Sequence, residues 1–329
     1  MAYTDREDLS YLGNILLAGQ NRTPFLKDIV IANDGDSNPA NVDMFGGMMS
    51  NIKTYPSFLY PMSQPYSLDS ASQPAVTEAS SVASQTASTT TRNQVTNTSQ
   101  IFQETAEVSH AKLSAYGELG GVVIGGESNP IQNELAFQIR TKSEQIAIDM
   151  EYSFLNGTYQ VGSDASTASK TRGIITASII NTVDASSAVL SVTLINTLLA
   201  EMVGNGANVD GCTIYVNSFQ KIAIDALYSY AEQSRFQGGT TIQEIFTPFG
   251  RLGISFNPHV PAGTLLVADT RRCNPVFTPV MLEDGSNVLV AVERVAQVAA
   301  SYKWQLYLQA GIDYSHAQFH GTLTSLATS

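Results

Sequence analysis

The chain has 329 residues, of which 43% are hydrophobic and 14% are charged, and 17 basic against 29 acidic side chains give a net charge of −12. This length allows two ordinary domains or one large domain with excursions, and the apolar share is sufficient for a hydrophobic core. The acidic balance argues against tight, direct binding to nucleic acid, which needs a basic face, because the only adjacent basic pair is Arg271–Arg272.

The surface is expected to be polar but weakly charged. The charged share lies below the usual ~25%, and Ser, Thr, Asn and Gln fill the difference. Such a surface suits a protein that meets many copies of itself without strong charge repulsion. Only Cys212 and Cys273 are present, which excludes a disulfide scaffold and favours two buried thiols in a reducing cytoplasm.

The sequence shows no targeting signal. The start, MAYTDREDLSYLGN, lacks the basic-then-apolar order of a signal peptide. No apolar run approaches the ~18 residues of a membrane span. We therefore expect no membrane association, and we expect the sequons at Asn21, Asn97 and Asn156 to stay unmodified.

The first 66 residues read as an irregular, extended arm. Five prolines and the Gly46–Gly47 pair interrupt them. Three short apolar patches, at 15–17, 29–31 and 58–60, are expected to dock on other surfaces as a belt. None of these patches has the length or the period of an independent helix.

Residues 67–100 are rich in Ser and Thr, which make up 15 of these 34 positions, while only Asp69, Glu78 and Arg92 are charged. A disordered linker is one interpretation of this composition. The stretch runs into a strand-like segment at 100–108, which favours a Thr-rich β-hairpin. A hairpin that folds back near residue 88 would have arms of ~65 Å, whereas a body of this length has a radius of gyration of only ~20 Å. Such a hairpin would project from its own subunit and would need a neighbour to lie on.

The clearest helix is predicted over 130–156. Asn129 is expected to cap it and Pro130 suits its first position. Apolar residues then recur at steps of three or four, mainly Ile131, Leu135, Ile139, Ile146, Met150 and Phe154. This spacing predicts a long amphipathic helix packed on a sheet along one face.

From about residue 174 the pattern is mixed α/β. A helix is expected after Ser191, and a second one is expected to be capped by Ser218. A short buried strand is predicted at 212–216. Further strands are expected at 251–256, 264–268, 276–281, 288–292, 302–310 and 312–323. The fold class is therefore mixed α+β.

No catalytic, cofactor or metal site is predicted. On a strand, His316 and His320 would lie ~13 Å apart, too far to chelate one ion. No phosphate loop, nucleophile elbow or zinc-protease motif is present. The glycine-rich run at 117–126 lacks the order of a phosphate-binding motif, and a flexible hinge is the better interpretation of it.

Several segments resemble one subfamily of the major capsid proteins of tailed bacteriophages. They are SQIFQETAEVS (99–109), NELAFQIRTKSEQIAIDMEYSFLNG (133–157), TRGII (171–175), IYVNSFQKIAID (214–225), FGRLGISFNPHVPAGTLLVADTRRCNPVFTPV (249–280) and LQAGIDYSHAQFHGTLTSL (308–326). They follow the order of the family and cover roughly residues 95–329.

The resemblance implies the Hong Kong 97 fold. It places an N-terminal arm at 1–66, an extended β-hairpin loop at 67–110, and an axial domain at 175–290. A peripheral domain would comprise 111–174 and 291–329 and include the spine helix at 130–156. Copies are then expected to form the pentamers and hexamers of an icosahedral head, a structural virion component and not an enzyme. The head would enclose double-stranded DNA without sequence-specific binding, and would assemble in the cytoplasm of a host bacterium.

The expected partners are other copies of the chain, a portal protein, a scaffolding protein and possible decoration proteins. The loop residues expected at subunit interfaces are Ser80, Ser88, Thr90, Arg92, Thr96, Glu104 and Glu107. The hinge is expected at Gly117, Gly120, Gly121, Gly125 and Gly126, where maturation would bend the chain. No cofactor is expected.

Two departures from the family pattern matter. Some members cross-link through a lysine of the extended loop, but residues 54–111 contain none, so we expect a non-covalent shell. Some members carry a removable N-terminal scaffolding domain, and here we expect a separate scaffolding protein or none. Two alternatives remain at this stage: a compartment shell of the same fold that holds cargo enzymes, and a virion decoration or surface protein.

Overall fold

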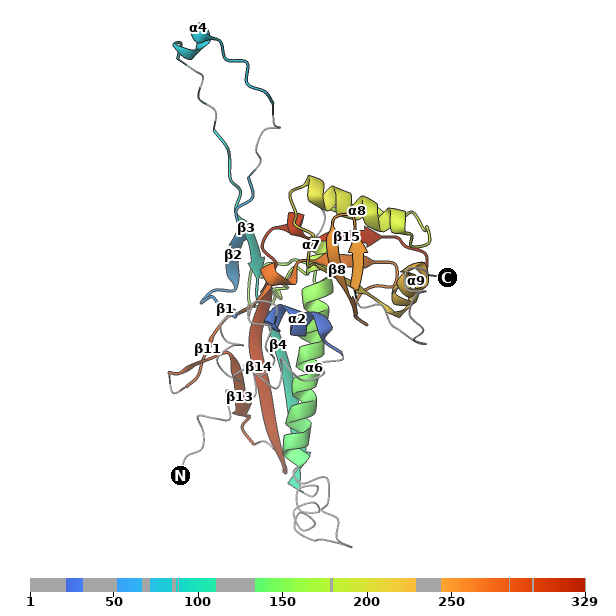
Figure 1. Cartoon of the computed structure of the whole chain (residues 1–329). Helices are drawn as coiled ribbons and strands as arrows, with labels where there is room; N and C mark the ends of the chain where they lie inside the picture. The colour runs from blue at the N-terminus through green and yellow to red at the C-terminus, as the bar shows by residue number, and fades with distance from the viewer. Residues whose placement is uncertain are drawn as a thin grey trace.

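The computed structural model describes most of the chain as one elongated body with a long projecting loop (Figure 1). The described residues are 22–31, 52–66, 72–84, 87, 89–110, 134–177, 180–228, 244–283, 285–297 and 299–328. Helices and sheets are interspersed along the chain, which confirms the mixed α+β class.

The first of two main sheets has five strands and is organised around β14 (Ser301–Asp313). Along one side, β14 pairs antiparallel with β4 (Gln100–Ser109) over ten residue pairs. Along the other side it pairs with β13 (Val290–Arg294) and then with β10 (Asn274–Phe277). The short β1 (Lys53–Thr54) adds to β10 in parallel. The long strands of this sheet run along the length of the elongated body (Figure 1).

Helix α6 (Glu134–Asn156) lies along this sheet (Figure 1). Its buried side chains include Ile139, Ile146, Met150 and Phe154, and these pack in one cluster with Leu306 and Leu308 of β14 among others. Burial of an apolar stripe at helical spacing stabilises a helix on a sheet. The predicted spine helix is therefore confirmed over 134–156, whereas its expected cap, Asn129–Pro130, lies outside the described residues.

The second sheet has six strands and mixes parallel with antiparallel pairing. Its strand order is β5 (Thr182–Asp184), β15 (Gly321–Thr324), β9 (Leu265–Ala268), β6 (Thr213–Val216), β8 (Gly250–Phe256) and β7 (Glu244–Thr247). Helices α8 (Val192–Gly204) and α9 (Ser218–Tyr228) pack beside it. A separate cluster, with Leu198 and Met202 of α8 against Ile214 and Val267, forms its core.

The remaining elements are short. They are α2 (Pro24–Ile31), β2 (Leu59–Ser63), α4 (Glu78–Ser81), β3 (Val95–Thr98), α7 (Ile174–Ala177), β11 (Val280–Met281), β12 (Asn287–Val288) and two 3₁₀ turns at Thr270–Arg272 and Ala317–Phe319.

The arm is not irregular over its whole described length, as the sequence suggested, although its helix is not an independent one. Residues Pro24–Ile31 form α2, and Phe25, Leu26 and Ile29 of this helix are completely buried in the cluster that also holds α6. Eight residues are too few for a helix that is stable alone. Tertiary packing supplies the stability that the local sequence pattern does not show.

The expected hairpin is also shorter than predicted. Its antiparallel ladder joins β2 to β3 and ends in a single bridge between Tyr66 and Arg92. Beyond that bridge, the described part of the loop holds the small helix α4 and no strand. An isolated two-stranded ribbon is only marginally stable in water, so the ladder persists only near the body.

The boundary expected at 290/291 does not match the two sheets. β10, which precedes it, pairs with β14, whereas β15, which follows it, lies between β5 and β9 in the six-stranded sheet. Nor does β4 belong to the projecting loop, because it pairs along β14 in the body. The resemblance supplied these bounds, and hydrophobic periodicity could not refine them, because it predicts strands but not their pairing partners.

Two local predictions are corrected as well. Ser191 caps α8 as expected, but the residue that caps α9 is Asn217, whose side-chain oxygen accepts from the Gln220 N–H at 2.9 Å. The chain does not form one strand over 312–323. Instead β14 continues through Gly311 to Asp313, and a turn with Ser315 at φ 59° separates it from β15.

Candidate assembly site: the projecting loop, its root and the arm

The projecting loop, described at residues 72–84, 87 and 89–94, extends away from both sheets (Figure 1). Nearly every described side chain in it is exposed. Val76 and Val82 are 63% and 87% exposed, which is unusual for valine. A segment of this kind buries nothing against its own subunit, so it is available to contact another one.

The tip of the loop has a local order of its own. The Thr77 hydroxyl accepts from the Ser80 N–H at 3.1 Å, and the Thr77 N–H donates to the Ser80 hydroxyl at 2.8 Å. This reciprocal capping box satisfies two free N–H groups at the start of α4. It shows why Ser80, an expected interface residue, is already hydrogen-bonded within the loop.

The other expected interface residues lie in different places. Thr90 and Arg92 are exposed on the loop, where Arg92 closes the bridge to Tyr66. Thr96 lies at the base of the loop, with its hydroxyl 3.3 Å from that of Tyr159. Ser88 and the hinge glycines Gly117, Gly120, Gly121, Gly125 and Gly126 lie outside the described residues.

Glu104 and Glu107 are bonded within the body and not in the loop. Both are on β4. The Glu104 carboxylate pairs with Lys142 of α6 at 2.9 Å, and the Glu107 carboxylate accepts from the Ser301 hydroxyl at 2.6 Å. These contacts tie β4 to the spine helix and to β14, so the chain's own structure already occupies both carboxylates.

The root of the loop is the buried end of β2 and β3, and it centres on Tyr60 and Asn97. These residues lie directly opposite each other in the ladder, and neither side chain is exposed. The Tyr60 hydroxyl donates to the Ile312 carbonyl at 3.0 Å, and the Asn97 side-chain N–H donates to the same oxygen at 2.9 Å. Burial raises the pKa of Tyr60 far above its usual value, so this hydroxyl stays protonated and remains a donor.

Gly311 makes room for this arrangement. A Cβ added at this position would clash with the Tyr60 hydroxyl and lie 3.0 Å from the Thr98 carbonyl oxygen. Nearby, the Ser99 and Thr278 hydroxyls are 2.9 Å apart, and Lys53 pairs with the buried Asp313 carboxylate at 2.6 Å. Sequence reasoning found none of these root residues, because each has at least one partner more than 170 positions away.

The arm is anchored by a buried carboxylate on the spine helix. Glu151 of α6 is fully buried, and its carboxylate accepts from the N–H groups of Phe25 and Leu26 at 2.9 and 2.6 Å and from the Asn257 amide at 2.6 Å. It thus caps the first turn of α2 from another element, where a negative charge is favourable. Burial nevertheless raises the pKa of Glu151 to about 7.

A second acid lies in the same region. The Tyr215 hydroxyl donates to the Asp28 carboxylate at 2.6 Å, and burial raises the pKa of Asp28 as well. The Phe25 ring packs edge-on against the Tyr215 ring, with centroids 5.4 Å apart. Through these contacts α2 joins α6 to β6, and so bridges the two sheets.

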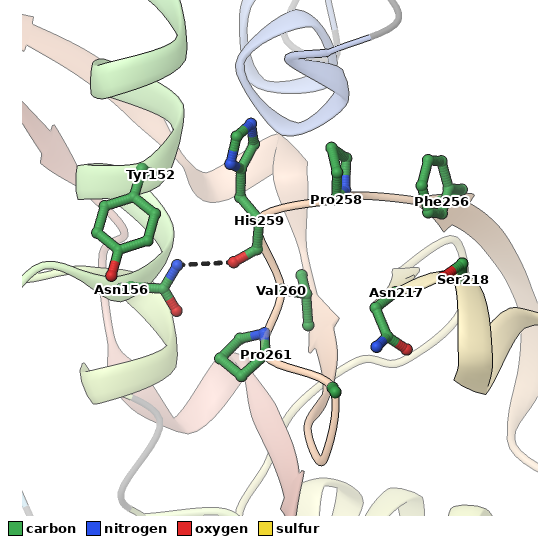
Figure 2. Close-up of a pocket in the computed structure, with 10 residues that line it drawn as sticks. Tyr152, Asn156, Asn217, Ser218, Phe256, Pro258, His259, Val260 and Pro261 are labelled. Carbon is green, nitrogen blue, oxygen red and sulfur yellow. Dashed lines mark hydrogen bonds between the residues drawn. The ribbon is translucent and has the colours of Figure 1, made fainter. Parts of the chain in front are cut away.

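A hollow of about 550 Å³ opens beside the end of α6 (Figure 2). Tyr152 and Asn156 line one side and Asn217 and Ser218 the other, with the segment around His259 between them. The Asn156 amide donates to the His259 carbonyl at 2.8 Å. The His259 imidazole lies 3.1 Å from the Arg22 carbonyl oxygen, so the chain itself already contacts the one histidine in this lining.

The histidines form no metal centre in the described part of the chain, where no group of three potential ligands gathers. His320 is buried, with its two ring nitrogens bonded to the Asp269 N–H and the Tyr314 carbonyl. Burial lowers the pKa of His320 to about 4, so it is neutral. Among the described helices, none is both long and apolar enough to cross a bilayer.

Comparison with known proteins shows which family and which fold this chain resembles. The family model described as SU10 major capsid protein matches residues 2–327. No curated protein sequence matches the chain. Among similar solved structures, the cyanophage A-1(L) capsid has a TM-score of 0.64 at 9% sequence identity, with 94% of this chain and 93% of that chain covered. The capsid of cyanophage P-SCSP1u has a TM-score of 0.53 at 9% identity, with 85% of this chain and 86% of that chain covered. The holo-SrpI encapsulin of Synechococcus elongatus has a TM-score of 0.54 at 10% identity, with 85% of this chain and 86% of that chain covered.

These matches settle the class of protein. The structural similarities, at such low identity, show the fold alone, and that fold is the Hong Kong 97 fold of tailed-phage capsids expected from the sequence. The family is one of structural capsid proteins and not of enzymes. Because the family model covers nearly the whole chain, this protein belongs to the SU10 major capsid protein family and is a subunit of a viral capsid shell.

Proposed function

We propose that copies of this chain assemble into pentamers and hexamers that close an icosahedral head around double-stranded phage DNA. The observation that carries the proposal is the projecting loop. Its Val76 and Val82 side chains are 63% and 87% exposed among the described residues. In a shell, each such loop would lie on a neighbour, and many moderate contacts would add up over a closed lattice.

The parts of the subunit then take the roles that the family implies. The five-stranded sheet with α6 would form the peripheral domain, and the six-stranded sheet with α8 and α9 the axial domain around the capsomer centre. The proposed division follows the sheets, so β10 goes with the peripheral domain and β15 with the axial one. The arm helix α2 spans both through Glu151 and Tyr215.

The distribution of lysines in the sequence supports a shell without covalent cross-links between subunits. Residues 54–111 contain none. Lys53, which precedes the root, pairs with the buried Asp313 carboxylate of its own subunit at 2.6 Å. Neither the loop nor this neighbouring lysine offers a free amine for a cross-link. Boiled, unreduced particles should therefore run as single 35.3 kDa chains on a denaturing gel, and a ladder of multimers would refute the proposal.

The acidic charge of −12 supports DNA as contents and not as a tightly bound ligand. We further propose assembly in the cytoplasm of a host bacterium, with a portal protein, a scaffolding protein or none, and possible decoration proteins as partners. A compartment shell is the second candidate, since the SrpI encapsulin shares the fold. Only the contents of the particle distinguish these two.

The experiment is to express the full chain in bacteria, purify particles and image them by electron microscopy. Closed shells of uniform size support the proposal, whereas dispersed monomers or fibres refute it. Particles from infected cells are then digested with nuclease before and after they are opened. DNA protected until opening supports the phage head, and protein cargo without DNA supports the compartment.

A further inference from the structure

We propose that the Tyr60–Asn97 pair is the device that sets the direction in which the projecting loop leaves the subunit. The inference rests on the proposed function, in which that loop contacts a neighbour, and it assigns Asn97 and Tyr60 as positioning residues for the contact. Both are buried within their own subunit. They hold the segment that contacts the neighbour.

The first observation is that one carbonyl of β14 receives both residues of a cross-strand pair. Tyr60 and Asn97 face each other across β2 and β3, and both donate to the Ile312 oxygen, at 3.0 and 2.9 Å. A carbonyl oxygen has two lone pairs, and here both are used. The two strands of the loop are therefore fixed to the same point of the body's central strand.

The second observation is that Asn97 also pairs with a second segment of the body. Its amide N–H donates to the Arg172 carbonyl at 3.2 Å, and its side-chain oxygen accepts from the Arg172 N–H at 2.8 Å. The Asn97 side chain therefore pairs with both the N–H and the C=O of Arg172, as the backbone of a neighbouring strand would. With a further bond from the Thr98 N–H at 2.9 Å, every hydrogen-bonding position of the amide is filled.

The third observation is that burial changes from complete to none within a few residues at the root. Asn97, Thr98 and Ser99 are fully buried, Val95 and Thr96 are half-buried, and residues 89–94 are exposed. The Arg172 guanidinium stacks on the Tyr159 ring at 4.4 Å, and the Tyr159 hydroxyl lies beside Thr96. Toward the tip, the described ladder ends in the single bridge to Tyr66. A small tilt at the root would therefore be amplified along the whole length of the loop.

The effect on assembly follows from geometry. Shell closure needs the loop to meet its neighbour within a narrow range of angles in every copy. If the root is loosened, each loop samples a range of directions, and ordering it on the neighbour costs conformational entropy. The subunit would keep its fold but would assemble less often into closed shells.

The test measures loop direction inside the full-length chain. Spin labels are placed at two exposed positions by Asn93→Cys on the loop and Thr141→Cys on α6, and the native Cys212 and Cys273 are buried. Labelled chain is diluted in unlabelled chain, so each measured distance lies within one subunit. Asn97→Ala and Tyr60→Phe are compared with this background, and shell yield is counted by electron microscopy.

The matched control is Asn181→Ala. Asn181 is also fully buried, and its amide also donates to two carbonyls, those of Gln318 and His320, at 2.7 and 2.8 Å, but in the six-stranded sheet. Asn97→Ala should at least double the width of the distance distribution and reduce the shell yield tenfold or more, with a smaller broadening for Tyr60→Phe. Asn181→Ala should lower the unfolding midpoint without broadening.

An unchanged distance distribution in folded Asn97→Ala would overturn the inference, as would equal broadening by Asn181→Ala. If Asn97→Ala does not fold, Tyr60→Phe decides alone, since it keeps the buried ring and removes only the hydroxyl. If the unmutated chain itself forms no shells, the proposed function fails, while the distance measurement still decides the positioning role.

Discussion

The arm helix α2 and the projecting loop both come from the first third of the chain, yet one is buried and the other is exposed. Phe25, Leu26 and Ile29 of the arm are fully buried in the core cluster that also holds the spine helix, whereas Val76 and Val82 of the loop are 63% and 87% exposed. The arm stabilises its own subunit. The described residues of the loop bury little against their own subunit, which supports the proposed role between subunits.

The difference lies in what each segment meets. The first turn of α2 meets the Glu151 carboxylate, which satisfies its N–H groups, and its apolar side chains meet a preformed core. The first turn of α4 must satisfy itself through Thr77 and Ser80. A short helix that caps itself can exist at the end of a loop, whereas one that is capped from another element depends on the fold.

The largest effect is expected from removing the loop. Joining Tyr66 to Arg92, which already bridge, by a short Gly-containing turn should leave the free energy of unfolding within about 0.5 kcal/mol of the original, because no core is lost. It should abolish closed shells. Urea unfolding and electron microscopy measure the two quantities. Normal shells without the loop would show that this comparison of loop and arm is wrong.

Large-to-small substitutions should separate arm from loop in stability. Phe25→Ala in the arm is expected to cost about 3–5 kcal/mol, since it leaves a cavity in a closed core. Val82→Ala in the loop is expected to change the unfolding free energy by less than about 0.5 kcal/mol. Urea denaturation of the unassembled chain measures both. Equal effects would contradict the assignment of the arm to the subunit's own core.

The arm anchor should also depend on pH. Glu151 has a pKa of about 7 in the folded chain and 4.5 as its ordinary value. Below pH 4.5 the carboxyl is protonated in both states, and its contribution to stability is fully present. As the pH rises to 7 the unfolded chain releases the proton first, so about 3 kcal/mol is lost.

The matching substitution is Glu151→Gln, which cannot titrate. The unfolding free energy of the original chain relative to this variant should fall by about 3 kcal/mol between pH 4.5 and 7.5. Glu78→Gln in the exposed α4 removes the same charge from the loop and serves as the control. A difference that stays constant across this pH range would show that the carboxyl is not held in the way described.

The smallest effect concerns the root that joins the loop to the body. Gly311→Ala should destabilise the chain by about 1–3 kcal/mol, because the new methyl group meets the Tyr60 hydroxyl and the Thr98 carbonyl. Adding Tyr60→Phe should recover part of this loss. A double-mutant cycle by urea unfolding measures the coupling. If the two changes in unfolding free energy simply added, a methyl group at position 311 would not be meeting the Tyr60 hydroxyl.

Periodicity was sufficient to predict the regular elements. Ile139, Ile146, Met150 and Phe154 repeat at helical spacing and are buried on α6, and the alternation from Tyr302 onward predicts β14. These patterns are local, so a single sequence contains them. Strand pairing is not local, so periodicity could not show that β4 and β10 pair with β14 or that β15 pairs with β9.

The residues that control the arm and the loop could not be predicted in this way. Glu151 is 126 positions from the Phe25 N–H that it accepts from, and in sequence it is one acid on a helix. Asn97 lies within a Ser/Thr-rich run and looked like an unused sequon. What distinguishes each is a set of distant partners with no periodic signature. The resemblance to phage capsids predicted a loop and an arm, but not which residues hold them.

The most direct test is a cryo-electron microscopy reconstruction of particles assembled from the purified chain. We expect closed shells in which residues 72–84 of each loop lie on a neighbouring subunit, while Phe25 and Leu26 stay in the core of their own subunit. Particles in which the loop folds back on its own subunit, or in which α2 inserts into a neighbour, would show that the roles assigned to loop and arm are wrong.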